Sequence, residues 1–218
     1  MFERALELDS GYAVAHAWLG CGLGQAMHLG VGDAQGLLDR AQAAAERARQ
    51  LDEDDSECHR ILAQVFILRR DLERARWHQE RALFLNPNDD RSVCAMGTIL
   101  LYSGQPEEAE TWIRKAMRLN PYHSESFWYY LAGALFHSGL DAEALEALRR
   151  VTRPKLRDLA LRAAAKGRTG GPAAARAEVE DLLAQEPDFD AERFLRSVPY
   201  GDEGARVSLR EALRAAGL

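Results

Sequence analysis

The chain of 218 residues has only three cysteines, Cys21, Cys58 and Cys94, which are far apart and odd in number. Disulfide frameworks use even sets of cysteines, so we expect a reducing compartment and a cytoplasmic location. No run approaches the ~18 consecutive apolar residues of a membrane span. The first residues enter an amphipathic helix pattern directly, with no visible signal peptide. The sequence therefore predicts no membrane partner.

Long runs of one charge are also missing. Acidic residues outnumber basic ones by 34 to 28, and the net charge is −6. Arginine and glutamate are interleaved, which is typical of solvated helix faces carrying ion pairs rather than of a phosphate-binding stripe. We therefore expect this segment to have no nucleic-acid partner.

Catalytic and metal-binding patterns are absent as well. No nucleophile, base and acceptor set is apparent, and no histidine pair shows the i, i+4 spacing with glutamate that forms a helical metal site. Glu107 and Glu108 follow Pro106 in what we predict to be the first helical turn, where acids complement the helix dipole. The sequence predicts no enzyme activity, no cofactor and no metal.

What the chain does have is an internal repeat of 34 residues. The equivalent pairs are Ala75 and Ala109, Ala82 and Ala116, Leu85 and Leu119, and Pro87 and Pro121. This period predicts stacked helical hairpins. Small residues such as Gly20 and Ala63 let the two helices of a hairpin approach closely, and the residue before each proline leaves the helical region and ends the second helix.

The repeat predicts a solenoid over residues 1–187, followed by a C-terminal capping tail over 188–218. Its parts are an incomplete hairpin (2–9), an expanded repeat (12–51), two regular repeats (54–86 and 88–120), a further repeat (122–152) and a degenerate hairpin (154–187). A loop with Gly30, Gly32 and Gly36 divides the expanded repeat, and residues 167–172 break the degenerate hairpin. Terminal repeats depart from consensus because they cap the stack.

These features resemble the tetratricopeptide repeat (TPR) superfamily. The resemblance implies an all-α, right-handed solenoid of helical hairpins that works by binding. A narrower resemblance links RRDLERARWHQERALFLNPND (69–89), PEEAETWIRKAMRLNPYH (106–123) and LREALRAAGL (209–218) to the C-terminal repeats of bacterial class III adenylate or guanylate cyclase-related regulators. It implies a regulatory segment that binds a partner or an attached output domain. The start in mid-hairpin at Met1 favours a fragment of a longer protein, with a misassigned gene start or a degenerate stand-alone protein as alternatives.

Matching to the TPR pattern places the binding residues on a concave groove lined by the first helix of each hairpin. They are Arg60, Gln64, Arg91, Cys94, Thr98, Tyr102, Tyr129, Phe136 and His137. We expect a protein or peptide partner there, with a small-ligand sensor as the alternative. The lysine, asparagine and arginine set with which the family clamps a peptide carboxylate is absent.

Two further patterns leave alternatives open. Trp77 and Trp112 recur near the same place on the second helix, and we predict packing between repeats rather than a ligand cage. At the N-terminus, Phe2, Ala5, Leu6 and Leu8 lack a hairpin mate. Such an apolar edge favours self-association or the docking of upstream residues.

Overall fold

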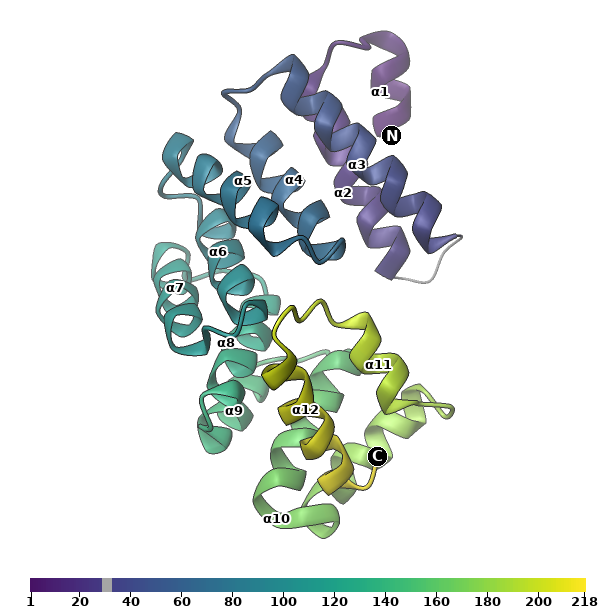
Figure 1. The fold of residues 1–218 in the computed structure, drawn as a ribbon, viewed down its shortest axis with the longest axis vertical. Helices are drawn as coiled ribbons and strands as arrows, with labels where there is room; N and C mark the ends of the chain where they lie inside the picture. The colour runs from purple at the N-terminus through teal and green to yellow at the C-terminus, as the bar shows by residue number, and fades with distance from the viewer. Residues whose placement is uncertain (29–32) are drawn as a thin grey trace. The chain divides into compact units, whose positions relative to one another are not determined.

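A computed structural model describes residues 1–28 and 33–218 (Figure 1), which form twelve helices and no strand. The helices are α1 (Phe2–Leu8), α2 (Ala13–His28), α3 (Ala34–Leu51), α4 (Ser56–Leu68), α5 (Leu72–Leu85), α6 (Asp90–Tyr102), α7 (Pro106–Leu119), α8 (Ser126–His137), α9 (Asp141–Leu148), α10 (Leu156–Gln185), α11 (Ala191–Ser197) and α12 (Glu203–Ala216). The predicted all-α fold is confirmed. None of the described helices is both long and apolar enough to cross a membrane.

Aspartates begin several of these helices. The Asp55 carboxylate accepts hydrogen bonds from the backbone N–H groups of Glu57 and Cys58 at 2.6 and 3.2 Å. Asp71 and Asp202 cap α5 and α12 in the same way. Each carboxylate satisfies N–H groups that have no partner inside the helix. The acidic residues in the loops between helices therefore fix where these helices start.

The chain forms two compact units, Met1–Ile99 and Leu100–Leu218. In the first unit α2 packs against α3, α4 packs against α5, and α2 packs against α4. Gly20 marks the close approach of α2 and α3, because a Cβ atom there would lie 2.9 Å from the Ala41 carbonyl oxygen. Ala63 on α4 is fully buried. The close approach predicted at Gly20 is confirmed, and Ala63 lies in the core.

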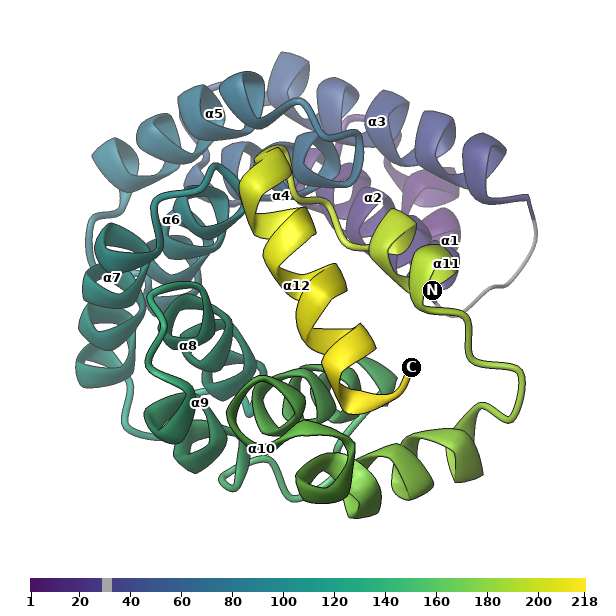
Figure 2. The same cartoon turned by 60° about the horizontal axis from the view of Figure 1, so that its bottom comes forward.

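In the second unit, α8 packs against α7 and α9, and α10 packs against α9 and α12. Figure 2 shows α12 in yellow lying alongside α10. The break predicted over residues 167–172 is confined to Gly171, whose φ of 68° and ψ of −166° interrupt α10 just before Pro172. Gly167 stays helical and meets α12 instead, since a Cβ atom there would lie 2.4 Å from the Ala216 nitrogen.

The N-terminal region also differs from expectation in one detail. Of the predicted loop glycines, Gly30 and Gly32 lie outside the described residues, whereas Gly36 lies in the first turn of α3 rather than in the loop. Asp33 explains the early start of this helix, because its carboxylate accepts from the N–H groups of Gln35 and Gly36.

The apolar N-terminal edge is partly covered. Phe2 stacks on Trp18 with ring centroids 6.4 Å apart, and α1 packs against α2. Ala5 and Leu6 are half-buried, but Leu8 is 78% exposed. Self-association through this edge stays a prediction.

Candidate functional site

In the first unit, the predicted binding residue Arg60 is buried on α4 beside Glu57. Its guanidinium donates hydrogen bonds of 2.8 and 2.7 Å to the two Glu57 oxygens. The same guanidinium lies 5.9 Å from the centre of the Trp18 ring. Such a two-pronged pairing fixes both side chains more firmly than a single contact would. The Arg60 guanidinium is therefore paired with Glu57 and is not exposed to solvent.

Arg91 on α6 reaches the same carboxylate from the next repeat. Both of its contacts to Glu57 are 3.3 Å long, and a third contact of 3.2 Å joins it to Asp89. The side chain of Arg91 is 48% exposed. Glu57 thus sits between a buried and an exposed guanidinium, and only the exposed one is open to a partner.

The remaining predicted residues of this unit differ in accessibility. Gln64 on α4 is exposed, but Cys94 and Thr98 on α6 are buried. The Thr98 hydroxyl donates to the Cys94 carbonyl at 3.1 Å, and burial raises the pKa of the Cys94 thiol above its usual range. Gln64 and Arg91 are therefore the two groove residues that the first unit offers to solvent.

In the second unit, the predicted residues Tyr102, Tyr129 and Phe136 are all buried. His137 is half-buried, and its Nε2 atom lies 2.8 Å from the Tyr200 hydroxyl. Burial lowers the pKa of His137 to about 4, so the imidazole is neutral at pH 7. These four residues stay a predicted binding surface, but here they face the interior of the protein.

Two residues that the sequence reasoning missed complete this cluster. Tyr200 packs edge-on against Tyr102, with centroids 5.2 Å apart and an interplanar angle of 87°. Arg157 on α10 places its guanidinium 4.2 Å from the Tyr129 ring centre. Tyr200 lies in the predicted capping tail, but no local pattern in the sequence indicates which repeat its side chain reaches.

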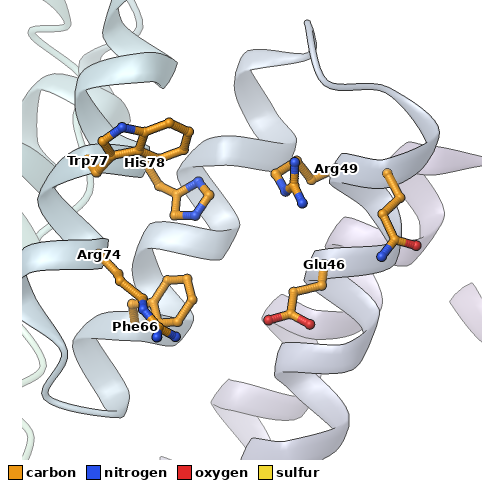
Figure 3. Close-up of a pocket in the computed structure, with 7 residues that line it drawn as sticks. Glu46, Arg49, Phe66, Arg74, Trp77 and His78 are labelled. Carbon is orange, nitrogen blue, oxygen red and sulfur yellow. The ribbon is translucent and has the colours of Figure 1, made fainter.

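A pocket of about 360 Å³ lies in the first unit, where α3 faces α4 and α5 (Figure 3). Its lining residues are Glu46, Arg49, Gln50, Phe66, Arg74, Trp77 and His78. Trp77 is 58% exposed, so the packing predicted for its ring covers less than half of the side chain. The ring meets His78 edge-on, with centroids 4.7 Å apart.

Histidines of this region pair with each other. The Nδ1 atoms of His59 and His78 lie 3.0 Å apart, and His59 Nε2 lies 3.0 Å from the Glu53 carbonyl oxygen. Burial lowers the pKa of both rings, to about 4 for His78. Among the described residues, no group of three or more His, Cys, Asp or Glu side chains could hold a metal ion.

A comparison with known protein families identifies the repeat. The family profile described as tetratricopeptide repeat matches residues 33–90 and 94–155, together more than half of the chain. No curated protein sequence matches.

Solved structures similar to this chain share its fold at low identity. PilW, a type IV pilus biogenesis factor, is 19% identical with a TM-score of 0.67, covering 89% of this chain and 87% of PilW. TTC0263, a TPR protein of Thermus thermophilus, is 19% identical with a TM-score of 0.66, covering 93% and 99%. YrrB, described as a TPR protein with an unusual peptide-binding site, is 19% identical with a TM-score of 0.54, covering 86% and 93%. The chain belongs to the tetratricopeptide repeat family, whose members in general mediate protein–protein interactions.

Proposed function

We propose that this chain is a non-catalytic scaffold that binds a protein or peptide partner through the exposed side chains Gln64 and Arg91. The observation that carries the proposal is the Glu57 carboxylate shared by Arg60 and Arg91. Arg60 holds this carboxylate by two short bonds, whereas Arg91 holds it by two long ones. Arg91 can therefore release Glu57 and bind a carboxylate of the partner, while Glu57 stays paired with Arg60.

An extended acidic segment fits this arrangement. The guanidinium presents five donors in a plane, which suits a carboxylate approaching from solvent. Gln64 adds an exposed amide that can donate to and accept from a peptide backbone. Such a site gains specificity from charge and from main-chain hydrogen bonds together.

The regulatory part of the proposal rests on the narrower resemblance of residues 69–89, 106–123 and 209–218 to cyclase-related regulators. On this proposal the segment works in the bacterial cytoplasm and the partner is either a separate protein or an attached output domain. The sequence of the natural gene upstream of Met1 tests this part. A cyclase or DNA-binding domain there would support it, and a chain with neither would contradict the attached-domain form.

The binding role is tested with a peptide library displayed on phage and selected against the purified chain. We expect acidic sequences, whose affinities are then measured by fluorescence polarisation. Arg91→Ala should weaken them about tenfold, the equivalent of ~1.4 kcal/mol. Arg76→Ala is the matched control, because Arg76 forms an exposed pair with Glu80 on α5 at 3.0 Å. Selected peptides that bind Arg91→Ala and Gln64→Ala as well as the natural chain would refute the site.

The pocket beside Trp77 supports a second candidate, a small-ligand sensor that controls an attached output domain. Arg49 lines this pocket and has no ion-pair partner among the residues that the structure describes. An exposed indole beside a free guanidinium suits an aromatic carboxylate. Indole-3-acetate and benzoate should then raise the melting temperature, and Trp77→Ala should remove the effect. No shift with either compound would leave the scaffold role as the better account.

A further inference from the structure

The C-terminal part of the chain carries an extended segment, Val198–Asp202, between α11 and α12. Tyr200 at its centre is 3% exposed. Its hydroxyl lies 2.8 Å from His137 Nε2, and its ring lies 5.2 Å from Tyr102 and 5.0 Å from His137, centroid to centroid. A single aromatic side chain thus anchors the segment on residues at the ends of α6 and α8.

The backbone of the segment is held at the same place. The N–H groups of Gly201 and Asp202 both donate to the Tyr102 carbonyl oxygen, at 2.9 and 3.2 Å. Tyr102 is the last residue of α6, where a helix leaves carbonyl groups without internal partners. Gly104 follows with a φ of 77°, and a Cβ atom there would lie 2.8 Å from the Asp202 carboxyl carbon. The end of α6 therefore accepts main-chain donors and leaves room for a side chain beside them.

This combination is that of a bound peptide. One anchor side chain enters a pocket, and main-chain N–H groups pair with the receptor, which are the two elements of extended-peptide recognition. The contact between Tyr200 and His137 is polar, and both groups can hydrogen-bond to water when they separate. Opening exposes the buried side chains of Val198 and Tyr200, so the segment stays bound in most molecules and is released by a local opening.

We infer that Val198–Asp202 is an internal ligand of the second unit, and that a partner peptide with a tyrosine followed by a small residue and an aspartate competes with it for Tyr102 and His137. The inference rests on the proposed binding function and adds a second peptide site with its own regulation. The internal ligand holds the site closed until the partner is abundant enough to displace it.

Release of the segment also involves α12, which follows it directly. Gly167 on α10 lets the Ala216 backbone approach, and Arg168 donates to the Ser208 hydroxyl of α12 at 3.4 Å. A Cβ atom at residue 167 would collide with this backbone. Gly167→Ala should therefore loosen α12 and favour the open state without touching Tyr102 or His137.

The test uses a fluorescein-labelled peptide of residues 196–204, RSVPYGDEG, and the full chain. We expect Tyr200→Ala to bind this peptide at least tenfold more tightly than the natural chain, because its own anchor is gone. Gly167→Ala should also bind more tightly, and His137→Ala combined with Tyr200→Ala should lose the gain. Tyr122→Ala is the matched control, since Tyr122 is 96% exposed and should leave the affinity unchanged.

The inference would be overturned if the natural chain and a folded Tyr200→Ala chain bind the labelled peptide equally well, or if neither of them binds it. If circular dichroism shows that Tyr200→Ala unfolds, hydrogen exchange on the natural chain decides. The amides of Gly201 and Asp202 should exchange through a local opening, faster than the buried amides of α10. Exchange of all these amides at one common rate would also overturn it. Library-selected peptides that still require Arg91 would keep the proposed function while this inference falls.

Discussion

Glu57 and Arg91 stand one repeat apart, 34 residues, and their charged groups meet across two contacts of 3.3 Å. Both residues lie near the start of the first helix of a hairpin, Glu57 on α4 and Arg91 on α6. The same position thus carries an acid in one repeat and a base in the next. Because stacking brings equivalent positions together, this alternation joins neighbouring hairpins by charge.

Removing the shared carboxylate should cost more stability than removing its outer partner. Glu57→Gln leaves the Arg60 side chain, which is only 6% exposed, without a counter-charge. We expect a loss of roughly 1–3 kcal/mol in the free energy of unfolding. Arg91→Ala breaks the more exposed pair and should cost less than ~1 kcal/mol. Urea denaturation measures both, and equal losses would show that Arg60 finds another partner.

Two glycines on α2 provide a matched pair for the packing argument. Gly20→Ala places a methyl group 2.9 Å from the Ala41 carbonyl oxygen, whereas a Cβ atom at Gly22 meets nothing within 4 Å. We expect Gly20→Ala to destabilise the first unit by roughly 1–3 kcal/mol. Gly22→Ala should stabilise it by about 0.5–1 kcal/mol, because alanine suits a helix better than glycine. Thermal unfolding that moves both variants in one direction would contradict the placement of this close approach.

The fold could be predicted because its signals are local and repeated. Alanines such as Ala75 and Ala109, 34 residues apart, are fully buried as the spacing requires. Pro106 begins α7, and the helix before Pro87 ends at Leu85. Each of these signals acts within a few residues of itself. The positions of the helices and the faces that they bury can therefore be predicted from the sequence alone.

The candidate site could be predicted only in part, because its accessibility depends on contacts that are distant in sequence. Tyr200 reaches His137 across 63 residues, and Arg91 reaches Glu57 across 34. The separation of 34 residues between Glu57 and Arg91 equals the repeat length, so this pair could have been found by comparing charges at equivalent positions. The separation of 63 residues between His137 and Tyr200 is unrelated to the repeat length. Nothing in the sequence therefore indicated that the rings of Tyr102 and Phe136 would be covered.

The three thiols should react with different rates. Cys58 and Cys94 are buried, and burial raises the pKa of Cys58 to about 12 and that of Cys94 further still. Cys21 is half-buried, and burial raises its pKa as well. Because the thiolate is the reactive form, we expect Ellman's reagent at pH 8 to label Cys21 first and the other two only on unfolding. A Cys21→Ser chain should lose the early phase, and an unchanged early phase would assign it to a buried thiol.

Acid should destabilise the protein through its buried histidines. Burial lowers the pKa of His78 and of His137 to about 4 in the folded chain, whereas an unfolded histidine titrates near ~6.5. Between these values the unfolded chain binds more protons, so stability falls as the pH drops from about 6.5 to 4.

The size and assignment of this effect can be measured by urea denaturation at pH 7.5, 6, 5 and 4.5. Each buried histidine should contribute up to about 1.4 kcal/mol of lost stability per pH unit in this window, and nothing above it. His137→Gln keeps a hydrogen-bonding group near Tyr200 but cannot be protonated, so its stability should fall less steeply. His123→Gln is the control for the loss of a histidine, because the His123 ring contacts the adjacent Ser124 carbonyl oxygen and stacks on Phe127. If His137→Gln and the natural chain lose stability in parallel, the acid sensitivity belongs to other groups.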